Sequence, residues 1–517
     1  MYSYVPKSSA GEECGRGVRA RSCHGEGTAI QCCFRGKGTD YGTLLAKCEG
    51  GIKGGFDMRR TILLPVILLF SIVPLAAQTS KPSPLLAPTP PMGWNSWDSY
   101  GMAVDESEFK ANADWMAQHL KQFGWQYAVV DEGWFLQNPE SGGKPQWEYN
   151  LDANGRYVPA VNRFPSAANG AGFKPLADYV HGLGLKFGLH IIHGIPRQVV
   201  SKNLPIGSSV GSTFHAAEAA DRADVCEWNS DNFGVKDNAA GQAYYDSMAQ
   251  LYAGWGLDFI KVDCISSRPY KETEIRMISA ALKKTGRPIV LSLSPGPTSL
   301  AVASSVRRYA EMWRISDDFW DYWKPEPGQA WSPQTLQGQI ATAVGWAPHI
   351  EPGHWPDADM LPIGYIGPHP GLGSARSTRF THDEQRTLVG FWSIIRSPLI
   401  LGANLTRNDD WTTSLVTNPE VIDIDQHSTA NRPLIVTNGL VIWSAQPEDG
   451  KGQYLGIFNR GDSELKVSLR WNEIGLRLGH AYLVRDLWER RDIGSQTSLQ
   501  LTLPPHASAL YRLTIAD

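Results

Sequence analysis

The sequence has no excess of charge of either sign, because 48 Lys and Arg side chains face 52 Asp and Glu side chains. Binding to nucleic acid or to an anionic membrane through charge needs a strongly basic surface, so a formal net charge of −4 argues against both partners. Internal repeats and low-complexity tracts are also lacking after residue 77. With 517 residues, of which 42% are hydrophobic, the chain has the composition of a globular protein with a large core.

Long hydrophobic runs are equally scarce. One run, residues 61–77, follows the basic start Met58-Arg59-Arg60 and ends in two alanines. This order is typical of a secretory signal peptide, and the two prolines and short length of the run disfavour a membrane anchor. We therefore expect a signal peptide at about 58–77, an exported (periplasmic or secreted) protein, and no membrane contact of the mature form.

Cysteine is rare except at the beginning of the chain, where residues 1–57 hold five of the seven. Since a signal peptide starts a chain, we expect 1–57 to be a non-native upstream extension; a small Cys-rich metal or disulfide module is the alternative. The other two, Cys226 and Cys264, suggest one disulfide in an exported protein. Residues 78–91 are a Pro-rich lead-in that we expect to be extended.

Short apolar runs alternate with amphipathic stretches such as 106–124 and 241–256 over residues 92–420. The candidate strands are 92–97, 127–134, 186–192, 258–264, 288–294, 310–316 and 397–402, with a less clear run at 346–355. About eight strand–helix units predict a (β/α)₈ barrel; a doubly wound sheet is the alternative, but no Gly-rich phosphate fingerprint supports it. Residues 425–517 show short alternating strands and predict an antiparallel β-sandwich.

Polar residues close most of the apolar runs, at the strand ends where such barrels place their active sites. They are Trp97, Asp98, Asp131, Glu132, His190, Lys261, Asp263, Ser294, Arg314, Asp317 and Asp318, and a later loop adds Asp357 and Asp359. A single strand-end Asp can simply cap the next helix, but carboxylates on at least three strand ends make that explanation insufficient. Lys261 projects to the same side of its strand as Asp263, and we expect it to keep that carboxylate ionised.

Carboxylates without a metal-ligand pattern suit glycoside hydrolysis, in which one carboxylate attacks the anomeric carbon and another protonates the leaving oxygen. A metal-dependent hydrolase or transferase is an alternative, since His190, His193 and His354 could be ligands. However, His190 and His193 would face opposite sides of a strand, and the helical H-E-x-x-H pattern is lacking. A non-catalytic sugar-binding protein is a further alternative. We expect no metal and no cofactor.

Seven motifs now carry a resemblance to a known family. They are PPMGWNSWDSYG, VVDEGW, KFGLHI, DFIKVDC, WRISDD, HWPDADML and RSPLILGANL, in this order between residues 85 and 515. This series resembles glycoside hydrolase family 27, which contains α-galactosidases and α-N-acetylgalactosaminidases. The resemblance implies a (β/α)₈ barrel with a C-terminal antiparallel β domain, and a retaining exo-glycosidase without cofactor that removes terminal α-D-galactosyl residues from oligosaccharides or polysaccharides. α-N-Acetylgalactosaminidase or β-L-arabinopyranosidase activity is the alternative on the same scaffold.

The same resemblance implies roles for single residues. Asp263 matches the nucleophile, and Asp318, four residues after Arg314, matches the acid/base in preference to Asp317. The residues that match or replace sugar ligands are Trp97, Asp131, Glu132, His190, Lys261, Ser294, Arg314 and Asp359, and Cys226–Cys264 matches a disulfide beside the nucleophile.

The sequence departs from the family pattern in four respects, the last of which involves two residues. Glu132 stands where an aspartate is usual, His190 where many α-galactosidases have tyrosine, and Cys264 follows the nucleophile directly instead of two residues later. Ser294 and Gly296 are smaller than the usual residues, which suggests room for a 2-acetamido group.

Overall fold

The computed structural model describes residues 85–140, 147–207, 214–326 and 333–516. The predicted upstream extension 1–57, the signal peptide 58–77 and the first half of the lead-in lie outside these ranges. Among the described residues, no helix has the length and apolar character needed to cross a membrane.

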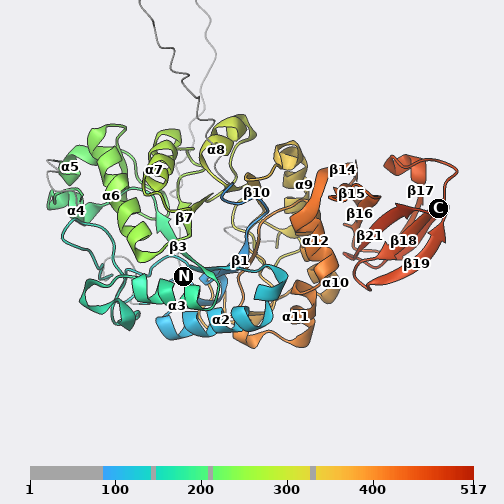
Figure 1. Cartoon of the computed structure of the whole chain (residues 1–517), viewed down its shortest axis with the longest axis horizontal. Coiled ribbons are helices and arrows are strands. Elements are labelled where there is room, and N and C mark those ends of the chain that lie inside the picture. The colour runs from blue at the N-terminus through green and yellow to red at the C-terminus, as the bar shows by residue number, and fades with distance from the viewer. Residues whose placement is uncertain (1–84, 141–146, 208–213, 327–332, 517) are drawn as a thin grey trace, which may run out of the picture. The chain divides into compact units, whose positions relative to one another are not determined.

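Within the described residues, eight parallel strands form one curled sheet in the order β10-β9-β8-β7-β3-β2-β1-β13 (Figure 1). Their bounds are β1 (Met92–Asn95), β2 (Tyr127–Val130), β3 (Lys186–Ile192), β7 (Phe259–Asp263), β8 (Val290–Leu293), β9 (Met312–Arg314), β10 (Trp355–Asp357) and β13 (Leu399–Leu401). The two outer strands are joined beyond β10, where Leu361 bridges Leu401 and its N–H donates to the Ile400 carbonyl at 2.7 Å. The predicted (β/α)₈ barrel is confirmed.

Helices connect successive strands and pack outside the sheet. The longer ones are α2 (Glu106–His119), α3 (Lys174–Gly182), α6 (Ala239–Trp255), α7 (Glu272–Lys284), α8 (Ala303–Tyr309), α9 (Leu336–Trp346), α10 (His382–Ile394), α11 (Asp410–Val416) and α12 (Pro419–His427). Local sequence fixes several of their ends: Asp105 and Thr381 each form a capping box at a helix start, and Gly256 ends α6 with a φ of 94°.

The interior of the barrel follows from the two-residue period of its strands. At one end, Tyr127, Phe259, Val290, Met312 and Trp355 form a single buried apolar cluster. Each strand then places polar or charged residues on the same face two or four positions later, because alternate side chains point inward. The apolar floor is tightly filled: a Cβ on Gly188 of β3 would lie 2.8 Å from the Val129 side chain.

The segment between β3 and α6 is the largest insertion at the barrel mouth. It contains α4 (Arg197–Ser201), α5 (Ala216–Ala219) and a small sheet of β4 (Ile195–Pro196), β5 (Ala220–Asp221) and β6 (Asn232–Val235). The sheet holds the preceding residues 226–231 against the mouth, since Asn232 donates to the carbonyls of Ile192 and His193 at 3.2 and 2.9 Å.

The C-terminal residues form the expected antiparallel domain. Six strands of the described chain pair in the order β14-β15-β16-β21-β18-β19, and β17 pairs separately with β20. Their bounds are β14 (Ser428–Val436), β15 (Leu440–Pro447), β16 (Gln453–Asn459), β17 (Leu465–Arg470), β18 (Tyr482–Asp486), β19 (Arg491–Gln496), β20 (Ser498–Leu503) and β21 (Ser508–Ile515). Side chains of both sheets share one apolar core, and α10 and α12 lie between this domain and the barrel strands (Figure 1).

The run at 346–355, which the sequence left unassigned, is not a continuous strand in the structure. Its first part ends α9 and continues as a 3₁₀ turn over Ala347–His349, and strand β10 begins only at Trp355. Two prolines and a glycine within the run prevent a continuous extended ladder.

Candidate active site

Lys261 of β7 is one of the cations inside the barrel mouth. Its Nζ lies 3.1 Å from Asp131 Oδ2, which also accepts a hydrogen bond of 2.6 Å from Asn95 Nδ2. Burial would raise the pKa of Asp131, but the charges of His190 and Lys261 outweigh it and lower that pKa. The expectation that Lys261 keeps Asp263 ionised agrees with the structure, because the Lys261 charge lowers the pKa of Asp263. The direct contact of Lys261, however, is with Asp131, two strands away.

Asp263 ends β7 and is held by groups from neighbouring elements. Its Oδ1 accepts from Ser294 Oγ at 2.7 Å, and its Oδ2 accepts from Trp228 Nε1 at 3.3 Å. His190 Nε2 lies 3.9 Å from the same Oδ2. Burial opposes ionisation, but His190, Lys261 and Ser294 together hold the pKa of Asp263 well below its usual range. This carboxylate is ionised throughout the neutral and mildly acidic range.

His190 supplies a buried positive charge beside that carboxylate. Burial would lower its pKa, but the carboxylates of Asp131 and Asp263 raise it. His193, three residues later, lies on the other side of the chain and contacts Glu274 instead. The prediction that the two histidines face opposite sides is confirmed.

Glu132 follows Asp131 at the end of β2, and the pKa of its carboxyl group is shifted in the opposite direction. Its Oε1 accepts a hydrogen bond of 2.7 Å from Asn229 Nδ2. Burial, joined by the charges of Asp263 and Asp131, raises the pKa of Glu132 to about 7 against the opposing charge of His190. Two adjacent carboxyl groups thus differ in protonation near neutral pH.

Arg314 of β9 is a further cation at the mouth and is buried. Its Nη2 lies 2.6 Å from Asp359 Oδ2 and 3.3 Å from Asp318 Oδ1. Asp359 has a φ of 84°, which turns its backbone N–H onto the Asp357 side chain at 2.8 Å. Burial raises the pKa of Asp359 to about 6; Arg314 opposes this rise, and the charges of Asp318 and Asp357 add to it.

The two adjacent aspartates after β9 point to different partners. Asp318 contacts Arg314 and leaves 50% of its side chain exposed, whereas Asp317 forms an ion pair with Arg268. Trp97 is half-buried, and its indole packs so closely on Gly371 that a Cβ there would lie 2.6 Å from Nε1. Asp318 and Trp97 therefore combine contact with the site and access to solvent.

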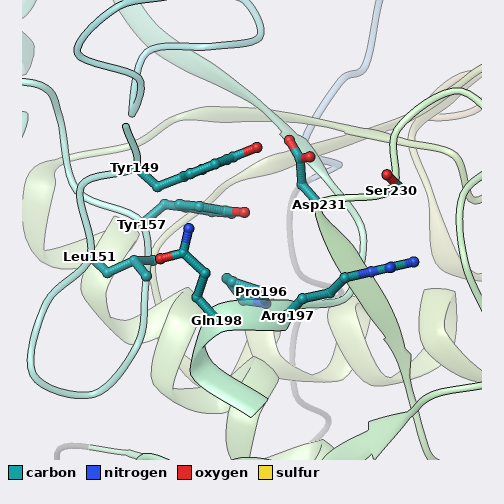
Figure 2. Close-up of a pocket in the computed structure, with 8 residues that line it drawn as sticks. All are labelled: Tyr149, Leu151, Tyr157, Pro196, Arg197, Gln198, Ser230 and Asp231. Carbon is teal, nitrogen blue, oxygen red and sulfur yellow. The ribbon is translucent and has the colours of Figure 1, made fainter. Parts of the chain in front are cut away.

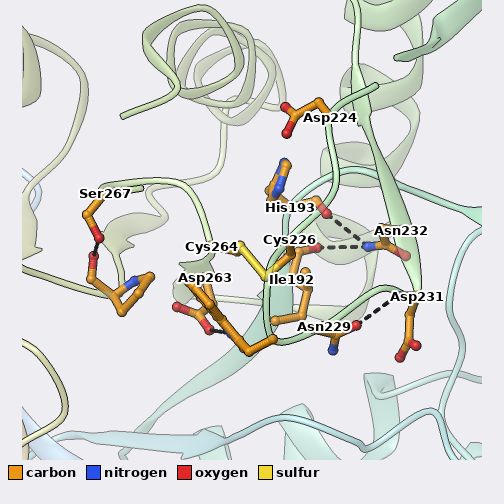
Figure 3. Close-up of a disulfide and its surroundings, with 12 residues drawn as sticks. Ile192, His193, Asp224, Cys226, Asn229, Asp231, Asn232, Asp263, Cys264 and Ser267 are labelled. Atoms are coloured by element: carbon orange, nitrogen blue, oxygen red, sulfur yellow. Dashed lines mark hydrogen bonds between the residues drawn. A yellow bond between two sulfur atoms is a disulfide. The ribbon is translucent and has the colours of Figure 1, made fainter. Parts of the chain in front are cut away.

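A disulfide joins Cys226 to Cys264, with an S–S distance of 2.19 Å and Cα atoms 5.9 Å apart (Figure 3). The direct succession of Asp263 and Cys264 is accommodated by a φ of 60° at Cys264. The bond ties the end of β7 to the segment that carries Trp228 and Asn229. Both of those residues were missed from the sequence, because they lie in an irregular loop without periodicity.

The small residues Ser294 and Gly296, which follow β8, do not leave free space in the site for a larger sugar substituent. Ser294 Oγ is used by Asp263, and a Cβ on Gly296 would lie 2.0 Å from the Ser316 carbonyl oxygen. Glycine is required at position 296 by this close approach of two backbones. The suggested room for a 2-acetamido group is therefore not provided by Gly296.

One group of potential metal ligands occurs among the described residues: His193, Asp224 and Glu274, whose ligand atoms lie within 4.8 Å of one another. Lys271 forms an ion pair with Asp224, and Tyr245 donates a hydrogen bond to Glu274. A lysine ammonium already supplies the positive charge here, so these contacts suit a buried structural network better than a cation site.

Comparison with known proteins agrees with this fold and with a carboxylate-lined site at the barrel mouth. The family profile described as alpha galactosidase A matches residues 229–427, and the profile of the alpha galactosidase C-terminal beta sandwich domain matches residues 437–513. A variant of the family 27 β-L-arabinopyranosidase from Geobacillus stearothermophilus, solved in complex with arabinose, is 45% identical. The match covers 84% of this chain and 98% of that one, with a TM-score of 0.78.

Two curated relatives are more distant. The α-galactosidase of Cyamopsis tetragonoloba is 29% identical over 442 residues, covering 83% of this chain and 87% of the relative. The α-N-acetylgalactosaminidase of Gallus gallus is 25% identical over 439 residues, covering 79% and 88%. Barrel, C-terminal domain and carboxylate-lined mouth together define a glycoside hydrolase. The chain belongs to glycoside hydrolase family 27.

Proposed function

We propose that this protein is a retaining exo-glycosidase that removes terminal sugars with the ring configuration of α-D-galactopyranose, with β-L-arabinopyranosides as its preferred substrates. These two sugars have the same configuration at their shared ring carbons and differ by the exocyclic CH₂OH group of galactose. The observation that carries the proposal is the ionised, half-buried Asp263, fixed by Ser294 and Trp228 at the barrel mouth.

In the proposed first step, an Asp263 oxygen attacks the anomeric carbon while the bond to the leaving oxygen breaks and Asp318 donates its proton to that oxygen. A glycosyl ester on Asp263 results. Water then attacks the same carbon, gives its proton to Asp318 and frees Asp263, so that configuration is retained. The depressed pKa of Asp263 supports the first role, and the half-exposed position of Asp318 supports the second, since water and leaving group must reach it.

We assign sugar binding to the groups around these two carboxylates. Asp131 with Lys261, and Asp359 with Arg314, are paired charges that suit hydrogen bonds to sugar hydroxyls, and Trp97 offers a flat aromatic wall. His190 and Ser294 contact Asp263 or lie close to it, so their primary effect is to hold the nucleophile ionised and oriented.

Glu132 is the basis for the preference for a pentopyranoside. It is one methylene longer than the aspartate usual in the family, and its carboxyl group reaches Asn229, the neighbour of the Trp228 that donates to Asp263. The extra length takes space from the sugar pocket, which favours a substrate without the exocyclic CH₂OH. The identity of 45% with a β-L-arabinopyranosidase supports the same preference. An α-galactosidase preference, the expectation from the motifs alone, remains the second candidate because the curated α-galactosidase is also related.

Export is proposed as well. The signal-peptide pattern at 58–77 supports it, and so does the Cys226–Cys264 disulfide, since such bonds persist in oxidising compartments. Mass spectrometry of the N-terminus of the natural protein tests this: a start shortly after residue 77 is expected, and a peptide from residues 1–57 would contradict both the export signal and the non-native extension.

The decisive experiment follows hydrolysis of nitrophenyl β-L-arabinopyranoside, α-D-galactopyranoside and the 2-acetamido analogue of the latter by proton NMR. We expect the arabinopyranoside to react fastest and its first released anomer to have the configuration of the substrate. The opposite anomer would rule out the proposed nucleophile. Faster hydrolysis of the galactoside would leave the mechanism standing and make the second candidate the correct one.

A further inference from the structure

Trp228 lies at the barrel mouth with its indole N–H on the candidate nucleophile and its ring partly in solvent. Its Nε1 donates to Asp263 Oδ2 at 3.3 Å, and 41% of the residue is exposed. The proposed reaction does not distinguish the two oxygens of Asp263 and gives Trp228 no part in either step. The two oxygens have different partners, however, so they can have different tasks.

One oxygen of Asp263 is held more firmly than the other. Oδ1 accepts from Ser294 Oγ at 2.7 Å, and Ser294 is only 1% exposed. Oδ2 has longer contacts, with the Trp228 N–H at 3.3 Å and with His190 Nε2 at 3.9 Å. An attacking oxygen must turn a lone pair toward the anomeric carbon, and the oxygen with the longer contacts loses less by doing so. Oδ2 is therefore the better placed of the two to attack, and Oδ1 would become the carbonyl oxygen of the glycosyl ester.

The segment that carries Trp228 is anchored close to both groups. The disulfide attaches Cys226, two residues before Trp228, to Cys264, the residue after the nucleophile (Figure 3). Asn229, the residue after Trp228, donates to Glu132 at 2.7 Å. Covalent and polar links thus fix the distance between the indole N–H and the carboxylate that accepts from it.

The other side of the same segment borders a pocket of about 270 Å³ (Figure 2). Ser230 and Asp231 of the segment line this pocket, together with Tyr149 and Tyr157 from the loop that follows β2. Because side chains do not fill this space, packing from that side does not press the indole onto the nucleophile. The position of the N–H therefore depends on the disulfide and on the neighbouring hydrogen bond.

The charge on Oδ2 changes in opposite directions in the two steps. In the first step, Oδ2 bonds to the anomeric carbon while the bond to the leaving oxygen breaks and Asp318 gives its proton to that oxygen. Oδ2 thereby becomes the bridging oxygen of an ester and loses its negative charge. In the second step, water attacks the carbon and gives its proton to Asp318, and the electron pair of the breaking bond returns to Oδ2. A donor that faces Oδ2 therefore stabilises the second transition state and does not help the first.

We propose that Oδ2 is the attacking oxygen and that the Trp228 N–H speeds the release of the glycosyl group from it. The inference rests on the proposed glycosidase function and deepens it, because it assigns the two donors around the nucleophile to different steps. Ser294 stays on the carbonyl oxygen through both steps, whereas Trp228 acts when the ester breaks. Trp228 is in this sense a catalytic residue, since it touches a reacting atom.

The test is Trp228→Phe, which keeps an aromatic ring at a partly exposed position and removes the N–H. The substrate is a dinitrophenyl β-L-arabinopyranoside, whose leaving group makes the first step fast. We expect kcat to fall about tenfold, the effect of one hydrogen bond to a charged group. KM should fall by a similar factor, and kcat/KM should stay within about threefold of the wild-type value, because it reports the first step.

Two further measurements detect the intermediate itself. Release of dinitrophenol by Trp228→Phe should begin with a burst close to the amount of enzyme present, because the glycosyl ester accumulates. Mass spectrometry of the intact protein during turnover should find a larger glycosylated fraction in the variant than in the wild type. The matched control is Trp411→Phe: Trp411 lies on α11 and donates its N–H to Gln385 at 3.1 Å, so both kinetic constants should stay at their wild-type values.

A contrary result separates the inference from the proposed function. Equal falls of kcat and kcat/KM without a burst would overturn the inference, because the indole would then serve the first step or only the fold. Unchanged constants in Trp228→Phe would overturn it as well. The glycosidase function survives both results if the wild-type protein hydrolyses the substrate with retention. If it does not act on the β-L-arabinopyranoside, the α-D-galactopyranoside of the same phenol is used. Failure on both substrates, or release of the opposite anomer, overturns the function and the inference together.

Discussion

Lys261 on β7 and Arg314 on β9 each stand among buried carboxylates inside the same barrel. Around Lys261, His190 adds a second positive charge, and the pKa values of Asp131 and Asp263 are lowered. Around Arg314, a single guanidinium serves several carboxylates, and the pKa of Asp359 is raised to about 6. Burial raises the pKa of each of these carboxyl groups, so the cations that face a group decide whether it stays ionised. Asp131 and Asp263 stay ionised for attack or binding, whereas Asp359, and Glu132 on the Lys261 side, can hold a proton.

The largest expected effect comes from removing the attacking carboxylate. Asp263→Asn keeps the shape of the side chain and its contact with Ser294 but cannot form a glycosyl ester. We expect kcat to fall roughly 10⁴-fold or more, in line with the loss of other enzymatic nucleophiles. Hydrolysis of a nitrophenyl glycoside measures this, and an unchanged melting curve would show that the fold survives. Near-normal turnover would mean that the Lys261 side does not supply the nucleophile.

The next effect separates two neighbours on the Arg314 side. Asp318→Asn should lower kcat by roughly 10² to 10⁴ for a disaccharide, as expected for loss of a general acid, and by less for a nitrophenyl glycoside, whose leaving group needs little protonation. Asp317→Asn is the matched control, because Asp317 pairs with Arg268 and should retain most of the activity. If the two variants exchanged behaviours, the acid/base assignment would move to Asp317.

The contrast between the two cations also predicts a pH dependence of stability. The folded-state pKa of Asp359 is raised, so its proton stabilises the folded state below pH 4 and this contribution is lost as pH rises through about 6. Asp359→Asn removes this titrating group. Between pH 4 and 7, the free energy of unfolding of the variant should therefore fall by on the order of 2 kcal/mol less than that of the wild-type protein.

The contribution of Asp131 to the free energy of unfolding should change with pH in the opposite direction. Its pKa is lowered, so its contribution is present above its unfolded value and is lost on acidification. Urea unfolding of wild type, Asp359→Asn and Asp131→Asn at several pH values measures both slopes. Equal slopes in the two variants would show that the cations do not set the protonation of their neighbours in different ways.

The smallest effect concerns the choice of sugar. Glu132→Asp shortens the side chain by one methylene next to Asp263, and the space gained should admit the exocyclic CH₂OH of galactose. We expect the ratio of kcat/KM for galactoside to that for arabinopyranoside to rise about tenfold, the usual value of one methylene in a pocket. Glu148→Gln, an exposed change in the same loop, serves as the control. A constant ratio would remove Glu132 from the determinants of specificity.

Much of the barrel could be predicted because its strands are short, buried and flanked by polar residues. The positions of Asp131, Lys261, Asp263 and Arg314 at the ends of apolar runs predicted that they lie at the mouth. Asp359 was taken instead from a later loop. Periodicity gives the face of a strand but not the partner across the barrel, which is why the Lys261–Asp131 contact was not foreseen.

The contacts from loops could not be predicted in this way. Trp228 and Asn229 reach the carboxylates only because a disulfide and a small sheet fold the long β3–α6 insertion back over the mouth. The sequence of residues 226–231 shows no local pattern that predicts the folding of this segment over the barrel mouth. The same holds for Gly296, whose role depends on the backbone of Ser316 in the loop that follows β9.

Helix α10 connects the candidate active site to the C-terminal β-domain. On one face, Trp392 Nε1 donates to the Asp359 carbonyl at 2.9 Å. On another, Phe391 packs edge-to-face on Trp443 and Phe458, with centroids 5.7 and 5.3 Å away. Heat that melts the C-terminal sheets would uncover Phe391 and loosen the support of Asp359. We therefore expect the C-terminal domain and the barrel to unfold as one cooperative unit in calorimetry, and we expect an enzyme trimmed to its barrel to lose the support of Asp359.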